Sequence, residues 1–127
     1  DVQMTLAQKS DLNGAIIVST PQDIALLDAR KGIDMFNQLS TPLIGMIENM
    51  STHICSACGH EEHVFGHGGV AAEAKKLGVP LLAEIPLHID IRLAADGGAP
   101  IVVSKPNSPA AEAFRSIAKG LIAKGHA

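Results

Sequence analysis

Short apolar runs alternate with helix-like segments along this chain, and that alternation restricts the fold more than any other feature. Four β-branched or apolar runs are predicted as buried strands: Ala15–Ser19, Leu43–Glu48, Leu81–Ile85 and Ile101–Val103. Helices are predicted over residues 20–38, 70–77, 89–95 and from 109 onward. Because parallel strands need crossover connections of this kind, we predict one α/β domain over residues 1–127, with a parallel sheet of about four strands flanked by helices.

Two helix starts carry a cap-then-proline signal. Thr20 is predicted as an N-cap, with Pro21 at the first helical position and Asp23 closing a capping box. Ser108 and Pro109 repeat the signal before the last helix.

Charge and composition exclude two classes of partner. The net charge is −3, from 10 Lys and Arg against 13 Asp and Glu, and the chain has no Trp or Tyr. A nucleic-acid partner is not expected, because such proteins usually present a basic stripe and stacking aromatics. The apolar runs are too short to span a bilayer, so no membrane partner is expected either. The chain begins at Asp1 without Met, which suggests a piece of a longer protein.

The two cysteines, Cys55 and Cys58, form a single CxxC motif. This usage argues against a secreted disulfide framework and favours a reducing compartment, the cytoplasm. Cysteines at this spacing can place both sulfurs on one metal ion, and Gly59 frees the backbone to turn tightly after them. The motif therefore predicts a metal, cluster or redox site.

Two thiolates leave a zinc ion or an iron–sulfur cluster short of ligands. A second copy of the chain could supply another pair across a two-fold axis. Alternatively His60 or His63 could complete a self-contained zinc site, or the pair could act in redox chemistry. Four of the six histidines lie in this segment: His53, His60, His63 and His67.

Two strand ends are candidate nucleotide contacts. Asn49 follows the strand ending at Glu48, and its amide complements the edge of adenine. Pro86 and Leu87 follow the strand ending at Ile85. Ligands of doubly wound sheets gather at such carboxyl ends, although an Asn after a strand is more often a turn former.

Several motifs together resemble a known family. In chain order they are DVQMTLAQ from Asp1, STPQ from Ser19, GMIENM from Gly45, CSACGH from Cys55, LGVP from Leu77, EIPL from Glu84 and DGGAP from Asp96. They resemble Mrp/ApbC-type iron–sulfur cluster carrier ATPases, relatives of the MinD and ParA deviant-Walker ATPases. The resemblance covers essentially the whole chain and implies the C-terminal half of a P-loop NTPase fold.

The resemblance also implies the roles of individual residues. Cys55 and Cys58 would be ligands of a [4Fe–4S] cluster bridging a homodimer through the CxxC loop, with zinc as a substitute. Asn49 would contact adenine, and Pro86 and Leu87 would lie beside the base. The recipients would be apo iron–sulfur proteins.

One departure limits what the chain alone is expected to do. The family's phosphate loop, with its Lys and Mg²⁺-binding hydroxyl, lies upstream of Asp1, and no GKS or GKT triplet occurs here. ATP and Mg²⁺ are therefore expected in the full-length parent only, and this chain is expected not to hydrolyse ATP. The alternatives are a zinc-stapled binding module and a MinD/ParA-like positioning ATPase, whose one candidate membrane anchor is Ser116–Ala127.

Overall fold

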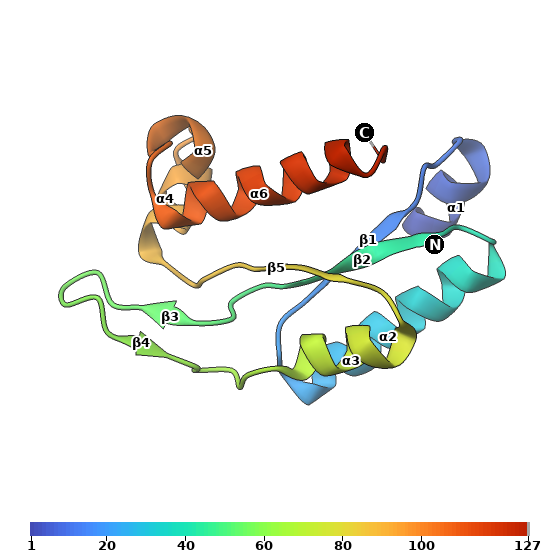
Figure 1. The fold of residues 1–127 in the computed structure, drawn as a ribbon, viewed down its shortest axis with the longest axis horizontal. Helices are drawn as coiled ribbons and strands as arrows, with labels where there is room; N and C mark the ends of the chain where they lie inside the picture. Colours follow the sequence, from blue (N-terminus) through green and yellow to red (C-terminus); the bar gives the residue numbers. More distant parts are fainter. Residues whose placement is uncertain (127) are drawn as a thin grey trace.

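The computed structural model describes residues 1–126 and shows helices packed on a parallel sheet (Figure 1). The elements follow in the order α1 (Val2–Lys9), β1 (Ala15–Ser19), α2 (Asp23–Gln38), β2 (Leu43–Glu48), β3 (His53–Ile54), β4 (Glu61–Glu62), α3 (Gly69–Leu77), β5 (Leu81–Glu84), α4 (Ile89–Asp96), α5 (Ile101–Ser104) and α6 (Pro109–Ala123). The sheet has the order β1–β2–β5, and β3 and β4 form a separate antiparallel hairpin. The predicted α/β class is confirmed, with three parallel strands.

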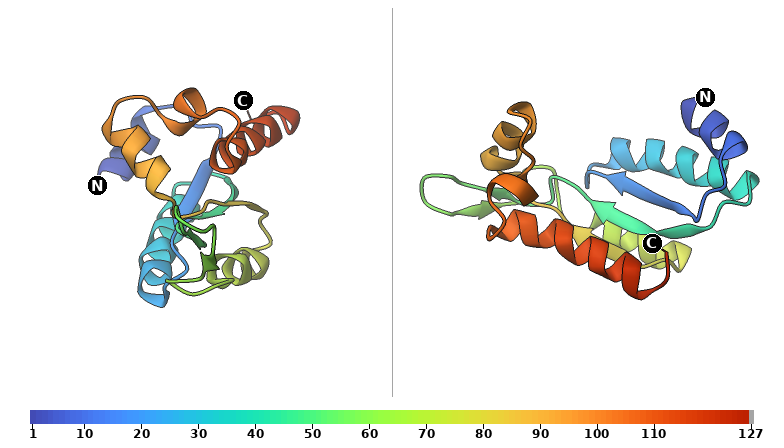
Figure 2. Two further views of the ribbon diagram at one scale, coloured as in Figure 1. Left: turned by 90° about the vertical axis from the view of Figure 1, so that its left-hand side faces the viewer. Right: turned by 90° about the horizontal axis from the view of Figure 1, so that it is seen from above.

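The sheet lies between α2 and α3 on one face and α6 on the other (Figures 1 and 2). Its central strand β2 contributes side chains to both faces, because successive side chains of a strand point to opposite sides. Met46 is fully buried in a cluster with Leu26 of α2 and Val70 of α3. Ile47, the next residue, shares the opposite cavity with Phe114 of α6. The best-packed core is therefore on the α2–α3 face.

Two glycines are required by the geometry around the sheet. A Cβ on Gly45 would lie 2.7 Å from Leu82 Cγ and 2.8 Å from the Pro80 carbonyl oxygen, so β2 and the start of β5 approach closely only with glycine there. Gly78 ends α3 in the left-handed region, with φ of 69°.

The two predicted helix caps have different outcomes. The Ser108 cap of α6 is confirmed: its Oγ accepts a hydrogen bond from Ala111 N at 3.2 Å, and Pro109 is the first helical residue. The Thr20 cap is wrong, because α2 begins at Asp23 without a side-chain cap. Thr20 Oγ1 instead donates to Gln22 Oε1 at 2.9 Å.

The predicted fourth strand is also wrong. Ile101–Val103 lies in the short helix α5, where the Pro100 carbonyl accepts from Val103 N at 2.8 Å and Ser104 N at 2.9 Å. A three-residue apolar run cannot distinguish a strand from a buried helical turn, and the hydrogen bonds accepted by the Pro100 carbonyl identify this run as a helical turn.

The C-terminal helix packs over the sheet. Ala111 at its start is fully buried, and Phe114, Ile117 and Leu121 line the cavity between α6 and the sheet. Within residues 1–126, no helix is long and apolar enough to cross a membrane. Ala127, the last residue of the candidate membrane anchor, lies outside the described residues.

Candidate metal centre at the hairpin tip

The CxxC motif forms the tip of the β3–β4 hairpin, which extends away from the sheet (Figure 1). His53 pairs with Glu62 and Ile54 with Glu61, so residues 55–60 form the connecting loop. Cys55 closes this loop in two ways: its N–H donates to the His60 carbonyl at 3.0 Å, and its carbonyl accepts from Gly59 N at 2.8 Å. This compact turn brings Cys58 back toward Cys55.

Backbone groups of the same turn favour the thiolate of Cys55. The N–H of Ala57 lowers the pKa of the Cys55 thiol most, and the N–H and the side chain of Cys58 act in the same direction. Partial burial and the Glu62 carboxylate oppose this shift of the pKa. Both cysteines are free, Cys55 half-buried and Cys58 exposed. The turn therefore presents two neighbouring sulfurs, one of them predisposed to ionise, as soft metals require.

The neighbouring histidines do not complete this pair of sulfurs. His60 Nε2 lies 3.4 Å from Glu62 Oε1, and His63 Nδ1 lies 3.2 Å from the Ser51 carbonyl oxygen. Across residues 1–126, no three or more His, Cys, Asp or Glu side chains converge on a common point. A zinc site contained in one chain would therefore need the histidines to move.

The base of the hairpin is joined to the segment that follows β5. Leu87 N donates to the Thr52 carbonyl at 2.8 Å, and the Leu87 carbonyl accepts from Ile54 N at 3.1 Å. Cys55 directly follows Ile54. The predicted base contact Leu87 is thus hydrogen-bonded to the strand that directly precedes the first cysteine, a connection that the sequence pattern did not reveal.

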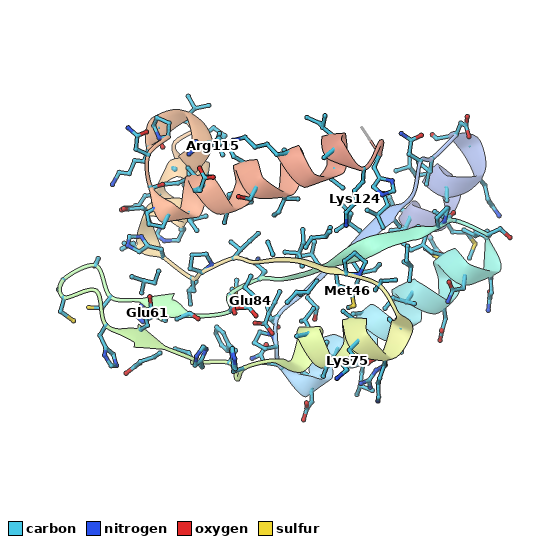
Figure 3. All side chains as sticks on the ribbon, in the orientation of Figure 1. Met46, Glu61, Lys75, Glu84, Arg115 and Lys124 are labelled. Carbon is cyan, nitrogen blue, oxygen red and sulfur yellow. The ribbon has the colours of Figure 1, made fainter. Side chains whose placement is uncertain are left out.

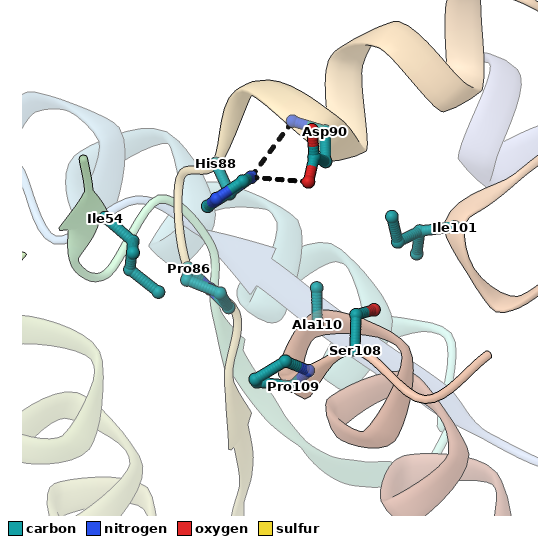
Figure 4. A pocket seen from close by; sticks show the side chains of 8 residues that line it. All are labelled: Ile54, Pro86, His88, Asp90, Ile101, Ser108, Pro109 and Ala110. Carbon is teal, nitrogen blue, oxygen red and sulfur yellow. Dashed lines mark hydrogen bonds and ion pairs between the residues drawn. The ribbon is translucent and has the colours of Figure 1, made fainter. Parts of the chain in front are cut away.

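The other predicted nucleotide contacts lie on two different cavities. Asn49 lines the cavity of about 410 Å³ between the sheet and α6, and its Oδ1 accepts from Met50 N at 2.9 Å. Pro86 lines a smaller cavity of about 140 Å³ with Ile54 and His88 (Figure 4). The structure therefore does not gather Asn49, Pro86 and Leu87 around one cavity.

A polar group on the smaller cavity was missed by the sequence analysis. His88 caps α4, with Nδ1 accepting from Asp90 N at 3.0 Å (Figure 4). Asp90 Oδ2 accepts from Lys105 Nζ at 2.9 Å, and this hydrogen bond lowers the pKa of Asp90. Histidine is an uncommon cap, so neither its identity nor its spacing signalled this role.

Glu48 is a second residue without a signal in the sequence pattern. It ends β2 and is completely buried, one oxygen accepting from Ser51 Oγ and the other without a hydrogen-bond partner among residues 1–126. The Glu48 carbonyl also accepts from Ile85 N at 2.7 Å, and Ser51 N donates to the Ile85 carbonyl at 3.0 Å. These two hydrogen bonds continue the ladder from β2 toward the hairpin. Figure 3 shows the described side chains on the ribbon, with Met46 of β2 and Glu61 of the hairpin labelled.

Comparisons with known proteins agree with this architecture. The chain is 52% identical over 118 residues to the iron–sulfur cluster carrier protein of Pseudomonas fragi, an alignment covering 93% of this chain and 41% of that protein. Among solved structures it resembles the Archaeoglobus fulgidus nucleotide-binding protein in complex with ADP, with a TM-score of 0.65 and 36% identity over 75% of this chain and 39% of that one. It also resembles the Pyrococcus furiosus cell division ATPase MinD, with a TM-score of 0.70 and 25% identity over 89% and 44%.

These relatives are longer than the chain, which spans about two fifths of their length. The family model described as ParA, NUBPL iron-transfer P-loop NTPase, matches residues 1–122. The chain therefore belongs to the ParA/NUBPL family of iron-transfer P-loop NTPases.

Proposed function

We propose that this chain binds an iron–sulfur cluster through Cys55 and Cys58 and passes it to apo iron–sulfur proteins. The observation that carries the proposal is the hairpin tip, which extends away from the sheet (Figure 1) and carries two neighbouring free thiols. An exposed tip is accessible to another protein, and the similarity to the Pseudomonas fragi carrier supports the same cargo. We place the protein in the cytoplasm, where both thiols stay reduced.

The cluster is shared by two chains in this proposal. One chain supplies two thiolates, whereas about four cysteine thiolates usually ligate a [4Fe–4S] cluster. A two-fold axis through the hairpin tips would present both cysteines twice. Zinc can occupy the same four sulfurs in place of the cluster, because it also favours tetrahedral thiolate ligation.

Nucleotide control belongs to the full-length protein. We propose that Asn49, Pro86 and Leu87 contact adenine there, in line with the ADP bound to the Archaeoglobus fulgidus relative. The hydrogen bonds that Leu87 donates to the Thr52 carbonyl and accepts from Ile54 N then connect the base-binding segment to the hairpin. This chain carries no Gly-Lys-Ser or Gly-Lys-Thr triplet, and we propose that alone it does not hydrolyse ATP.

Anaerobic reconstitution with iron and sulfide tests the cargo. The wild-type chain is expected to retain both elements and to donate them to an apo-ferredoxin, whereas the Cys55→Ala/Cys58→Ala variant is expected to retain neither. Equal iron and sulfide in the two proteins would contradict the proposal. His60→Asn is the matched control, because His60 lies in the same loop but is paired with Glu62.

A further inference from the structure

Two imidazole rings meet beside the base of the hairpin. The ring centroids of His63 and His67 are 4.2 Å apart, with planes inclined by 44°. Both side chains are exposed, in the segment between β4 and α3. Neither histidine belongs to the cysteine turn at residues 55–60, so the cysteine site does not account for their pairing.

The contacts of His63 Nδ1 indicate which of the two ring nitrogens is free to bind an ion. Its Nδ1 lies 3.2 Å from the Ser51 carbonyl oxygen, which can only accept, and 3.4 Å from the Thr52 hydroxyl oxygen, which can accept or donate. Both contacts are satisfied when Nδ1 carries the proton in the neutral ring, which leaves the lone pair on Nε2. Metal-binding histidines commonly donate their second ring N–H to a backbone carbonyl in this way, because the bond fixes the tautomer and the ring orientation.

The spacing of the two rings suits chelation of one ion. Imidazole nitrogens bind zinc-like ions at about 2.0–2.1 Å, so two such nitrogens in tetrahedral geometry are about 3.3 Å apart. The ring centroids of His63 and His67 are 4.2 Å apart, which is close enough for both rings to contact one ion. Both rings are exposed, so an ion can reach them without opening the core.

We propose that His63 and His67 form a second metal site, which binds a divalent transition-metal ion such as Zn²⁺, Co²⁺ or Fe²⁺ independently of the cysteines. Imidazole suits these ions. No third His, Cys, Asp or Glu joins the pair among residues 1–126, so water completes the coordination sphere. A site with two protein ligands and several waters exchanges its ion readily with solution. It is therefore suited to transient metal uptake beside the hairpin.

The test uses the complete chain carrying Cys55→Ala and Cys58→Ala, which removes both thiolates. Titration with Co²⁺ alone, followed by calorimetry and by broadening of histidine NMR signals, is expected to show about one bound ion per chain. Adding His63→Asn or His67→Asn is expected to weaken binding by about tenfold or more. The Asn amide can still donate to the Ser51 carbonyl, so His63→Asn removes the ligand nitrogen while keeping the local hydrogen bond.

The control is His60→Asn in the same background, which should leave Co²⁺ affinity unchanged because His60 lies beside Glu62. Absence of Co²⁺ binding by the cysteine-free chain would overturn the proposal. So would binding that survives both His63→Asn and His67→Asn, or binding that depends on His60. Circular dichroism of each variant verifies that the fold is retained. The cluster proposal is unaffected by either outcome, because the cysteines are absent from every arm.

Discussion

The core on the α2–α3 face of the sheet buries Met46 and Val70 completely, whereas the hairpin exposes Cys58 and is held by two cross-strand pairs and backbone hydrogen bonds to Leu87. The core depends on side-chain packing, and the hairpin depends on turn geometry. Stability and the candidate chemistry are therefore located in different parts of the molecule. Substitutions in the two regions should change different observables.

The largest expected effect is in the core. Met46→Ala should lower the free energy of unfolding by about 2–5 kcal/mol, because the cavity left at a fully buried site cannot collapse completely. Urea denaturation measures this loss. Leu93→Ala is the control: that side chain is 51% exposed, and its removal should cost about 0.5 kcal/mol or less. Equal losses of unfolding free energy in the two variants would show that Met46 packs no better than an exposed side chain.

The next effect concerns an ion pair that joins α2 to α3. Arg30 Nε lies 2.6 Å from Glu73 Oε1, and Glu73 is only 6% exposed. Arg30→Ala should cost about 1–3 kcal/mol, because a buried carboxylate loses its partner. Lys31→Ala removes the exposed 3.8 Å contact with Asp28 and should cost almost nothing in the same urea titration. A similar cost for both would mean that burial of Glu73 contributes little.

Alanine substitutions at two glycines should change the free energy of unfolding in opposite directions. A Cβ meets nothing within 4 Å at either Gly59 or Gly32, but Gly59 has φ of +74° and Gly32 is inside α2. Gly59→Ala should cost about 1 kcal/mol and weaken Co²⁺ binding by the cysteines, because the left-handed turn is strained. Gly32→Ala should stabilise the chain by about 0.5–1 kcal/mol without changing Co²⁺ binding. A loss of stability at Gly32 would contradict this account.

The smallest effect is a difference in reactivity without a change in stability. In the Cys58→Ala variant, the N–H groups of residues 57 and 58 remain near Cys55 and keep its pKa below the ordinary value. The pH midpoint for alkylation of Cys55 should therefore lie lower in the folded chain than in urea. Between the two midpoints the folded chain should react faster, because more of its thiol is ionised. Coincident midpoints would show that the turn does not favour the thiolate.

The sequence predicted the parts of the fold that depend on apolar content. The runs at Ala15–Ser19 and Leu43–Glu48, rich in β-branched and other apolar residues, form the predicted strands. The run at Ile101–Val103 has three residues, too few to distinguish a strand from a helical turn, and it lies in α5. The hairpin escaped prediction because its strands have two residues each and are held by backbone pairing, which side-chain periodicity does not report.

The candidate site was predictable only where residue identity determines chemistry. Cys55 and Cys58 were singled out as candidates because two cysteines at this spacing can place both sulfurs on one metal ion. The connection from Leu87 to Ile54, the ring pair of His63 and His67, and the burial of Glu48 all depend on how distant segments meet. A local sequence pattern does not report contacts between distant segments. The base contacts proposed for Asn49 and Pro86 remain predictions. The two residues line different cavities of this chain.

The most direct test of the shared cluster is native mass spectrometry of the anaerobically reconstituted chain. The account predicts a complex of two chains that holds one [4Fe–4S] cluster and separates into monomers when the cluster is removed. A single chain that retains a complete cluster would contradict it.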